Sequence, residues 1–348
     1  MHNSSLKELP DLLLPWYEVN KRDLPWRKDR EPYHVWLSEI MLQQTRVEAV
    51  KGFYDRFLNK LPTLSDLANA DDALLEKLWE GLGYYSRVRN LKKTANVVAD
   101  TYNGVFPVNH EDVLRLPGIG PYTAGAICSI CYDLKTPAVD GNVLRVISRL
   151  TDDTTPIDLP AFKKRVHDLL LSVYPDQAGA FTQALMELGA TVCGPNRAPE
   201  CGRCPCLHIC KAAKAGTAQS LPVKMPKRAR RIEEITVFVL SCDGKYALQK
   251  RPNAGLLSGL WQFPNIPNHL DASAVAAAVE GLGLKLKDIS RVVERKHIFT
   301  HVEWHMRGLY AEVSEMNPVF SWFDSVQINQ ETALPTAFRM FWEELNCV

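Results

Sequence analysis

The chain has 348 residues, of which 46% are hydrophobic and 23% are charged, so it has enough apolar residues for two globular domains. Its formal net charge of +1 excludes a globally basic nucleic-acid-binding protein, and any phosphate contacts must come from local clusters of charge. The sequence has no apolar run long enough to span a bilayer, and its N-terminus lacks the basic and apolar regions of a signal peptide. We therefore expect a cytoplasmic protein with no targeting signal and no membrane contact.

The first part of the chain carries apolar side chains at helical spacing from about Pro10 to Lys214, with short breaks. The clearest segments are Tyr33–Leu58, Ala73–Leu78, Leu91–Tyr102, Tyr122–Leu134, Asn142–Leu150, Ala161–Val173 and Ala178–Leu188. We therefore predict that residues 1–220 form an all-α domain.

The composition changes after Ser220. Residues 221–231 are basic, contain two prolines and show no periodicity, which is typical of a linker. Beyond them, β-branched or alternating segments predict strands at Ile235–Leu240, Tyr246–Gln249 and Lys296–Val313, with a helix at Ala272–Gly281. Residues 232–348 are therefore predicted to form an α+β domain.

The sequence LPGIG at residues 116–120 places two glycines on either side of one apolar residue. Gly118 and Gly120 allow a tight turn with exposed amides, and Pro121 suits the first turn of the helix that follows. Amides at a helix start bind anions such as DNA phosphate. An ordinary turn between helices fits the same residues.

Glu39 is the first candidate for acid chemistry. It follows Val35 and Trp36 by one helical turn and precedes Gln43 by one turn, on the same side of an amphipathic helix. Burial on an apolar face would raise the pKa of Glu39, as a general acid at neutral pH requires. Position alone also fits a solvent-facing glutamate.

Asp140 is the second candidate. It precedes Gly141 and Asn142 at the start of a predicted helix, where an aspartate often serves only as a cap. A protonated and an ionised carboxyl group are, however, the pair that hydrolysis of a glycosidic bond uses. The two acids therefore point to such hydrolysis if they share one site.

Five of the nine cysteines lie between Cys193 and Cys210. Cys193, Cys201, Cys204 and Cys210 are separated by seven, two and five residues, a pattern that favours an iron–sulfur cluster over structural zinc. Cys206 is an additional thiol in this loop.

Two other groups of possible metal ligands have simpler explanations. Cys128 and Cys131 lie in an apolar helix, which indicates buried structural thiols. His297, His301 and His305 fall on one face of a predicted strand, too far apart for one metal ion.

Several of these features occur together in one known order. They are EIMLQQT at 39–45, WEGLGYYSR at 79–87, LPGIG at 116–120, VDGN at 139–142 and the cysteine loop at 193–210. In this order, and over nearly the whole chain, the sequence closely resembles the MutY-type adenine DNA glycosylases of the helix-hairpin-helix superfamily. The resemblance implies a monomeric, nucleoid-associated enzyme that flips adenine out of duplex DNA and removes it where it is mispaired with 8-oxoguanine or guanine. It also implies a 4Fe-4S cluster on Cys193, Cys201, Cys204 and Cys210, and no catalytic metal.

The resemblance assigns roles to individual residues. Glu39 would protonate the departing adenine and then activate water, while Asp140 would stabilise the oxocarbenium-like sugar or bond to it transiently. The remaining roles concern support and binding: Tyr122 and Asn142 beside the two acids, Trp26, Arg27 and Gln183 around the flipped base, and Gln44, Thr45, Tyr84, Gly118 and Gly120 on the DNA.

Tyr122 separates two branches of the superfamily. The endonuclease III branch resembles this chain but has a lysine at this place, which forms a Schiff base with the opened sugar. A phenol cannot do so, and we therefore predict base removal with little or no strand cleavage. The alternatives are a lyase-active glycosylase of the endonuclease III type and a non-catalytic DNA-binding protein whose cluster senses redox state.

The C-terminal domain resembles a MutT-like Nudix module, most clearly in GLLSGLWQFP at 255–264. The helix that would carry several magnesium-binding glutamates has only one here, so we expect no nucleotide hydrolysis. The family implies recognition of 8-oxoguanine by Phe299, Thr300 and His301. Two features depart from its pattern: Thr300 stands where serine is common, and seven residues instead of six separate Cys193 from Cys201.

Overall fold

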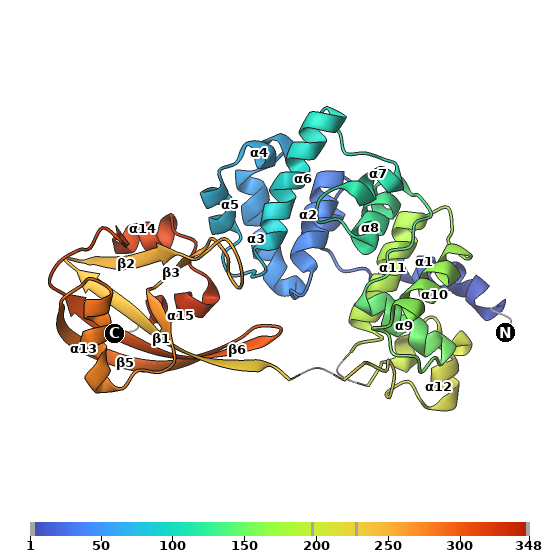
Figure 1. The fold of residues 1–348 in the computed structure, drawn as a ribbon. Coiled ribbons are helices and arrows are strands. Elements are labelled where there is room, and N and C mark those ends of the chain that lie inside the picture. The colour runs from blue at the N-terminus through green and yellow to red at the C-terminus, as the bar shows by residue number, and fades with distance from the viewer. Residues whose placement is uncertain (1–3, 196–197, 227–228, 346–348) are drawn as a thin grey trace. The chain divides into compact units, whose positions relative to one another are not determined.

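The computed structural model describes residues 4–195, 198–226 and 229–345 (Figure 1). The contacts between residues divide the chain into two compact units, Met1–Asn69 with Asn90–Pro226 and Ala70–Arg89 with Lys227–Val348. The segment 70–89, which the sequence assigned to the helical domain, thus makes its contacts with the C-terminal unit. That residues 1–220 fold as an independent domain remains a prediction.

The first unit is helical, as predicted. Its α-helices are α1 (Leu9–Asn20), α2 (Pro32–Leu42), α3 (Val47–Lys60), α4 (Leu64–Asn69), α6 (Ser86–Tyr102, whose first turn belongs to the second unit), α7 (His110–Arg115), α8 (Pro121–Tyr132), α9 (Gly141–Thr151), α10 (Pro160–Leu171), α11 (Ala178–Thr191) and α12 (Lys211–Ala215). Short 3-10 turns occupy Ser4–Glu8, Pro25–Arg27, Cys201–Arg203 and Leu207–Ile209.

One helix prediction was wrong. The segment Tyr33–Leu58 is not continuous, because α2 ends at Leu42 and α3 begins at Val47. Between them Gln44 has a φ of 58°, in the left-handed region that ends a helix. The break contains no glycine or proline, so it carries no local signal that a sequence pattern could reveal.

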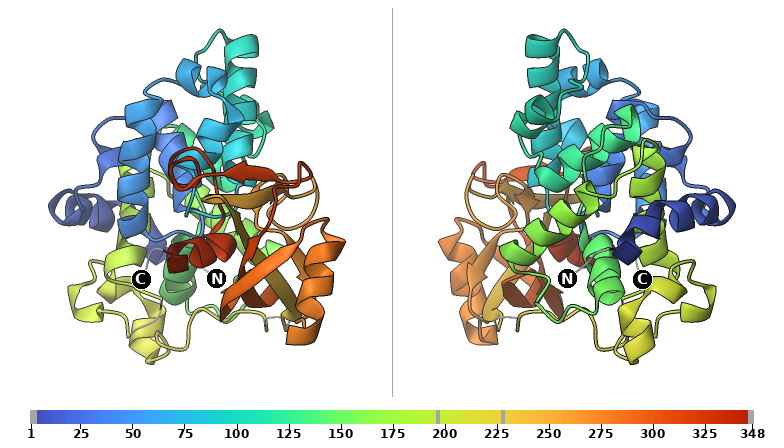
Figure 2. Two further views of the ribbon diagram at one scale, coloured as in Figure 1. Left: turned by 90° about the vertical axis from the view of Figure 1, so that its left-hand side faces the viewer. Right: turned by 90° about the vertical axis from the view of Figure 1, so that its right-hand side faces the viewer.

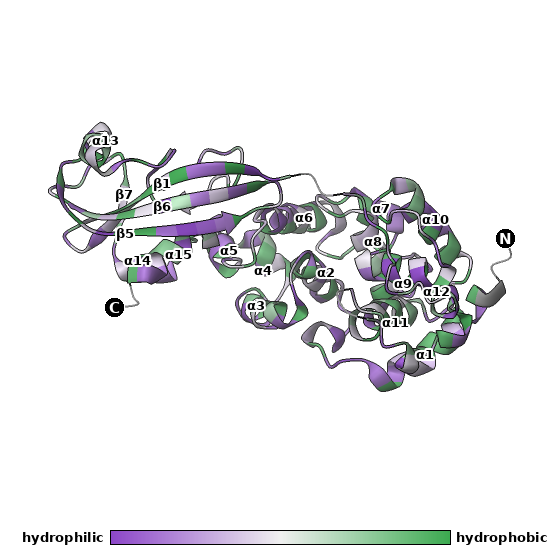
Figure 3. Cartoon of the chain, turned by 90° about the horizontal axis from the view of Figure 1, so that it is seen from below, coloured by the Kyte–Doolittle hydropathy of each residue, from purple (hydrophilic) through white to green (hydrophobic). Residues whose placement is uncertain are grey.

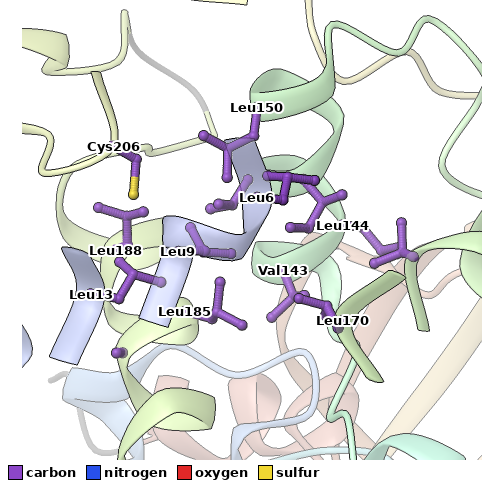
Figure 4. Close-up of a cluster of buried hydrophobic side chains, with 14 of the residues drawn as sticks. Leu6, Leu9, Leu13, Val143, Leu144, Leu150, Leu170, Leu185, Leu188 and Cys206 are labelled. Atoms are coloured by element: carbon purple, nitrogen blue, oxygen red, sulfur yellow. The ribbon is translucent and has the colours of Figure 1, made fainter. Parts of the chain in front are cut away.

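The core of the first unit fixes the start of α9. Leu9 and Leu13 of α1, Val143 and Leu144 of α9, and Leu185 of α11 belong to one buried cluster (Figure 4). Because α9 is packed on this cluster along most of its length, the residue that caps its first turn, Asp140, is held at a defined place.

The second unit contains a mixed sheet. Its strands are β1 (Arg231–Cys242), β2 (Lys245–Lys250), β3 (Trp261–Gln262), β4 (Asn265–Pro267), β5 (Leu286–Ile298), β6 (Val302–Val313) and β7 (Ser321–Phe323). The order is β3-β2-β1-β6-β5, with β4 beside β1 and β7 beside β2. Strands β1 and β6 run parallel, and β5 is antiparallel to β6. The α+β class of this part is confirmed.

Helices cover both faces of this sheet. Alternate residues of a strand point to opposite faces. Accordingly, Val237 and Val239 pack with α15 (Thr336–Leu345), whereas Phe238 and Leu240 pack with α13 (Val275–Gly281). The other α-helices of this unit are α5 (Asp72–Leu78) and α14 (Ser325–Gln330). Figure 2 shows the ribbon from two sides.

The predicted strand Lys296–Val313 is a hairpin of two strands. β5 ends at Ile298 and β6 begins at Val302, so Phe299, Thr300 and His301 form the turn. Strand β5 is predominantly hydrophilic in Figure 3. The three histidines are therefore not on one face of one strand: His297 pairs with Trp304, His301 lies in the turn, and His305 pairs with Lys296.

The predicted linker 221–231 is partly packed. Leu221 is buried, its carbonyl accepts a hydrogen bond from Arg149 Nε at 3.0 Å, and the Val223 carbonyl accepts one from the Ile157 amide at 3.0 Å. Lys227 and Arg228 of this segment lie outside the described residues, as do Asn196 and Arg197 of the cysteine loop. None of the helices among the described residues is long and apolar enough to cross a membrane.

Candidate active site

A cavity of about 560 Å³ in the first unit collects most of the residues that the sequence selected for chemistry. The predicted residues that line it are Trp26, Arg27, Glu39, Gln44, Thr45, Tyr122, Asp140, Asn142 and Gln183. They come from the 3-10 turn Pro25–Arg27, from α2 and the loop after it, from the starts of α8 and α9, and from α11. The two carboxyl groups, 101 positions apart in the sequence, therefore share one site.

Glu39 is buried on α2, with 6% of its surface exposed, so the solvent-facing interpretation was wrong. Burial raises the pKa of Glu39 to about 7, and the charge of Asp140 adds to this increase. The hydroxyl of Tyr122 donates a hydrogen bond to Glu39 Oε2, which lowers the pKa in part. Glu39 can thus hold or release a proton near neutral pH.

Asp140 does cap α9, and it also faces the cavity. Its Oδ1 accepts a hydrogen bond from the Val143 amide at 2.8 Å, and its Oδ2 accepts one from Asn142 Nδ2 at 2.7 Å. Burial raises the pKa of Asp140, while these donors and the nearby Arg145 lower it. Arg145 also donates to Asn142 Oδ1 at 2.8 Å, which fixes the asparagine beside the carboxylate.

The cavity wall also contains an ion-pair group centred on Glu187; Glu187 and Arg22 were not among the predicted site residues, whereas Arg27 was. Glu187 is fully buried and accepts hydrogen bonds from Arg22 Nε at 2.6 Å and from Arg27 Nη2 at 2.8 Å. These partners hold the pKa of Glu187 below its usual value despite burial. The available signal was a carboxylate in the apolar run ALMELG of α11, the same signal that identified Glu39.

Two of the residues predicted to contact DNA, Gln44 and Tyr84, have unusual backbones. Among the described residues with positive φ that are not glycine, asparagine or aspartate, only Gln44 (58°), Tyr84 (47°) and Leu257 (55°) occur. Such conformations are costly for these residue types and often mark functional sites. Gln44 and Tyr84 are also exposed.

Tyr84 belongs to the second unit, whereas Gln44 belongs to the first. It lines a pocket of about 440 Å³ with Phe299, Thr300, His301 and Leu257. The hydroxyls of Tyr84 and Thr300 are hydrogen-bonded at 2.8 Å. Phe299 contacts His297 and Trp304 edge to face, with ring centroids 4.6 and 4.8 Å away. The structure therefore joins the predicted reading loop to Tyr84.

The two glycines of LPGIG differ. Gly118 has a φ of 72°, and a Cβ there would lie 2.7 Å from the Asn90 side chain, so the turn itself requires glycine. Gly120 caps α8 with an extended backbone, and a Cβ there would meet nothing within 4 Å. Both lie two to four residues before Tyr122, at the start of the helix that supports Glu39.

Comparison with known proteins identifies the family. Residues 37–158 match the model of the HhH-GPD superfamily base excision DNA repair proteins, and residues 236–344 match that of the NUDIX domain. The adenine DNA glycosylase of Rattus norvegicus is 35% identical to 95% of this chain, which spans 73% of that protein. The chain belongs to the adenine DNA glycosylase family.

Further matches agree with this assignment. The adenine DNA glycosylase of Arabidopsis thaliana is 36% identical to 86% of the chain, although the chain spans only 56% of that protein. A thermostable thymine-DNA glycosylase of known structure superimposes on 61% of the chain with a TM-score of 0.56 and 30% identity, and 98% of it is covered. As a family member, this adenine DNA glycosylase is a base excision repair enzyme that binds DNA.

The cysteine loop of this glycosylase is compatible with a metal cluster. Cys193, Cys201, Cys204 and Cys210 line one pocket, together with apolar residues such as Val146 and Leu188, whereas Cys206 is buried in the core and does not line it. Among the described residues, no group of three or more histidine, cysteine, aspartate or glutamate side chains is arranged to hold a single metal ion. Burial raises the pKa of the Cys193 thiol, and Arg149, whose Nη1 lies 3.2 Å from Cys193 Sγ, opposes this increase.

Proposed function

We propose that this enzyme removes adenine that lies opposite 8-oxoguanine or guanine in duplex DNA, with little or no strand cleavage. The single observation that supports this most strongly is the cavity that the buried Glu39 and Asp140 both line. A cavity of about 560 Å³ leaves room for one flipped nucleotide.

Glu39 is proposed as the general acid. The bond between the sugar C1′ and adenine N9 breaks with its electron pair leaving on the base, and the Glu39 proton neutralises that charge. Water then adds to C1′ and gives its proton to the Glu39 carboxylate, which restores the acid. The elevated pKa of Glu39 makes both steps feasible near pH 7.

Asp140 is proposed to stabilise the positive sugar. Its carboxylate is held by the Val143 amide and Asn142, so it needs no rearrangement when the charge develops. Tyr122 holds Glu39 through its hydroxyl, and burial keeps the phenol pKa well above its usual value. Because a phenol has no amine group, Tyr122 cannot form a Schiff base with the sugar.

Glu187, Arg22 and Arg27 are proposed to line the base end of the pocket. Their mutual hydrogen bonds keep a charged, donor- and acceptor-rich wall in place beside Trp26, which is buried. Such a wall suits the polar edge of adenine, while the flat indole suits its face.

The second pocket is proposed to read the opposite base. Thr300 and Tyr84 present hydroxyls within hydrogen-bonding distance of each other, and Phe299 and His301 flank them. The threonine keeps the hydroxyl that serine would supply. Gly120 is proposed to let a DNA phosphate approach the start of α8, because open space lies where its side chain would be.

Cys193, Cys201, Cys204 and Cys210 are proposed to hold a 4Fe-4S cluster, which would tie the loop 193–210 to α9 and α11. We expect wild-type protein to contain about four iron atoms per chain. Cys201→Ser should lose most of the iron, whereas Cys206→Ala should keep it. Iron, sulfide and zinc analysis of the three proteins checks this, and zinc in place of iron would contradict it.

A panel of opposite bases tests the proposed substrate. Single-turnover rates would be measured on duplexes with adenine opposite 8-oxoguanine, guanine or cytosine, and with thymine opposite guanine. We expect excision of adenine opposite 8-oxoguanine and guanine, at least about tenfold slower excision opposite cytosine, and no thymine release. Release of damaged pyrimidines instead would support the lyase-active alternative, and no release from any duplex would support the redox-sensing one.

The excision rate should depend on pH in a defined direction. Because the pKa of Glu39 is raised to about 7, its protonated fraction falls as pH rises above that value. The single-turnover rate should therefore fall by about tenfold per pH unit well above pH 7. A pH series from 5 to 9 on one duplex measures it, and a rate that stays constant to pH 9 would exclude Glu39 as the acid.

A further inference from the structure

Hydrogen bonds and ion pairs hold both ends of the loop that carries Tyr84 against other elements of the second unit. Tyr84 lies between Glu80 and Arg89, and all three belong to the segment Ala70–Arg89 of the second unit. The partners of the two ends lie far away in the sequence, on α15 with the connection that precedes it and on the loop 252–259.

Glu80 holds the first end of this loop. Its Oε1 accepts hydrogen bonds from the Leu334 amide and from Arg339 Nε, both at 3.0 Å. Its Oε2 lies 2.6 Å from Lys77 Nζ, which also donates to the Thr332 carbonyl at 3.0 Å. The side chains of Lys77, Glu80 and Arg339 are only 18%, 15% and 17% exposed, so water screens this group weakly.

Arg89 holds the second end of this loop. Its Nη2 donates to the Ser258 carbonyl at 2.6 Å and to Glu76 Oε1 at 2.9 Å. Ser258 follows Leu257, which lines the Tyr84 pocket with a left-handed backbone. The two ends of the Tyr84 loop are thus held against different elements of the C-terminal unit.

Between these ends the loop has little freedom. Trp79 Nε1 donates to the Gly83 carbonyl at 3.0 Å, and buried Arg87 donates to the Leu82 and Gly83 carbonyls at 3.0 and 3.1 Å. The Arg87 guanidinium also lies 5.6 Å from the centre of the Tyr84 ring. Because these contacts make the loop rigid, a movement of Glu80 would also move Tyr84.

We propose that Glu80, through its ion pairs with Arg339 and Lys77, is a positioning residue that holds Tyr84 against Thr300 and so sets the preference for the base opposite adenine. This inference rests on the proposed reading of that base by the second pocket. Glu80 has no part in breaking the glycosidic bond. Its loss should lower discrimination between opposite bases and not the chemistry itself.

The test compares single-turnover excision of adenine opposite 8-oxoguanine and opposite guanine. Glu80→Gln keeps the size of the side chain and removes its charge; we expect it to reduce the ratio of the two rates by about tenfold while changing the rate opposite guanine by less than about threefold. Arg339→Gln should reduce the ratio similarly, and Arg339→Lys should reduce it less. Lys287→Gln, which breaks the exposed Lys287–Glu312 pair of the same unit, is the matched control and should leave the ratio unchanged.

Two further measurements separate positioning from general destabilisation. In a Tyr84→Phe background, Glu80→Gln should lower the ratio by no more than about twofold further, since both changes act on one contact. Hydrogen exchange of the amides of residues 81–85 should accelerate in Glu80→Gln, while exchange in α8 should not. An equal loss on both substrates, or additive losses in the Tyr84→Phe background, would overturn the proposal.

The failure of this inference can be distinguished from failure of the proposed function. If the wild-type enzyme prefers 8-oxoguanine and Glu80→Gln keeps that preference in full, only the role of Glu80 is wrong. If the wild-type enzyme shows no preference between 8-oxoguanine and guanine, the proposed reading pocket is wrong and the role of Glu80 falls with it.

Discussion

Glu39→Gln should lower single-turnover adenine excision by at least about 1,000-fold, since general acid catalysis contributes roughly 10²–10⁴ and Glu39 is proposed to act in two successive proton transfers. Glutamine has the size of glutamate and can accept the Tyr122 hydrogen bond, so the cavity should keep its shape. Duplex binding should persist, because the phosphate and opposite-base contacts lie elsewhere. The measurement is excision under enzyme excess, together with the Kd for the same duplex.

Unfolding would not explain this loss. The pKa of Glu39 in the folded protein lies above the ordinary value of 4.5, so wild-type stability falls as pH rises from about 4.5 towards 7, where the buried carboxyl group ionises. The substituted glutamine side chain cannot ionise, and the variant should melt no lower than wild type at pH 8. Glu48→Gln, at a side chain that is 78% exposed on α3, is the matched control and should excise normally. Turnover of the Glu39→Gln variant within about tenfold of wild type would contradict the assigned role.

Asp140→Asn should lower the excision rate by about 100- to 1,000-fold, the usual effect of removing one electrostatic stabiliser of a transition state. Asparagine caps helices about as well as aspartate, so the hydrogen bond from the Val143 amide and the start of α9 should survive. The change therefore removes the negative charge that would face the sugar cation, together with the oxygen that accepts the hydrogen bond from Asn142 Nδ2, and keeps the helix cap. Single-turnover excision and the melting temperature of the same sample measure both parts.

A second helix cap provides the control for this substitution. Asp324 caps α14 in the same way, with its side chain accepting from the Gln327 amide at 2.9 Å, but it lies outside the cavity. Asp324→Asn should leave the excision rate unchanged. If the two variants lost activity equally, or if Asp140→Asn lost activity only in proportion to its melting temperature, Asp140 would be a cap and not a catalytic residue.

Several residues that the sequence selected line one cavity, and the two carboxylates among them carry a local signal. Glu39 is a carboxylate within an apolar helix, and Asp140 stands at the start of a helix. Short recognisable sequences surround both residues. Burial excluded the solvent-facing interpretation of Glu39, which spacing alone could not do, and its role as an acid stays a prediction. Glu187 carried the same signal in α11, and its two arginine partners lie more than 150 positions away.

Long-range contacts and turns without glycine or proline were not predictable. The break after α2 and the turn between β5 and β6 contain residues that give no turn signal, so the sequence pattern predicts one strand where the structure has a hairpin. The placement of Tyr84 beside Thr300, and of Glu80 beside Arg339, joins segments more than 200 positions apart. Such pairings depend on the folding of the C-terminal unit and not on local propensity.

Identification of the released product tests the central claim most directly. A duplex with labelled adenine opposite 8-oxoguanine is incubated with an excess of enzyme, and the free base and the strand are analysed before and after treatment with alkali. We predict free adenine and an unbroken strand that is cut only after alkali. Strand cleavage in step with base release and without alkali, or no free adenine, would contradict this prediction.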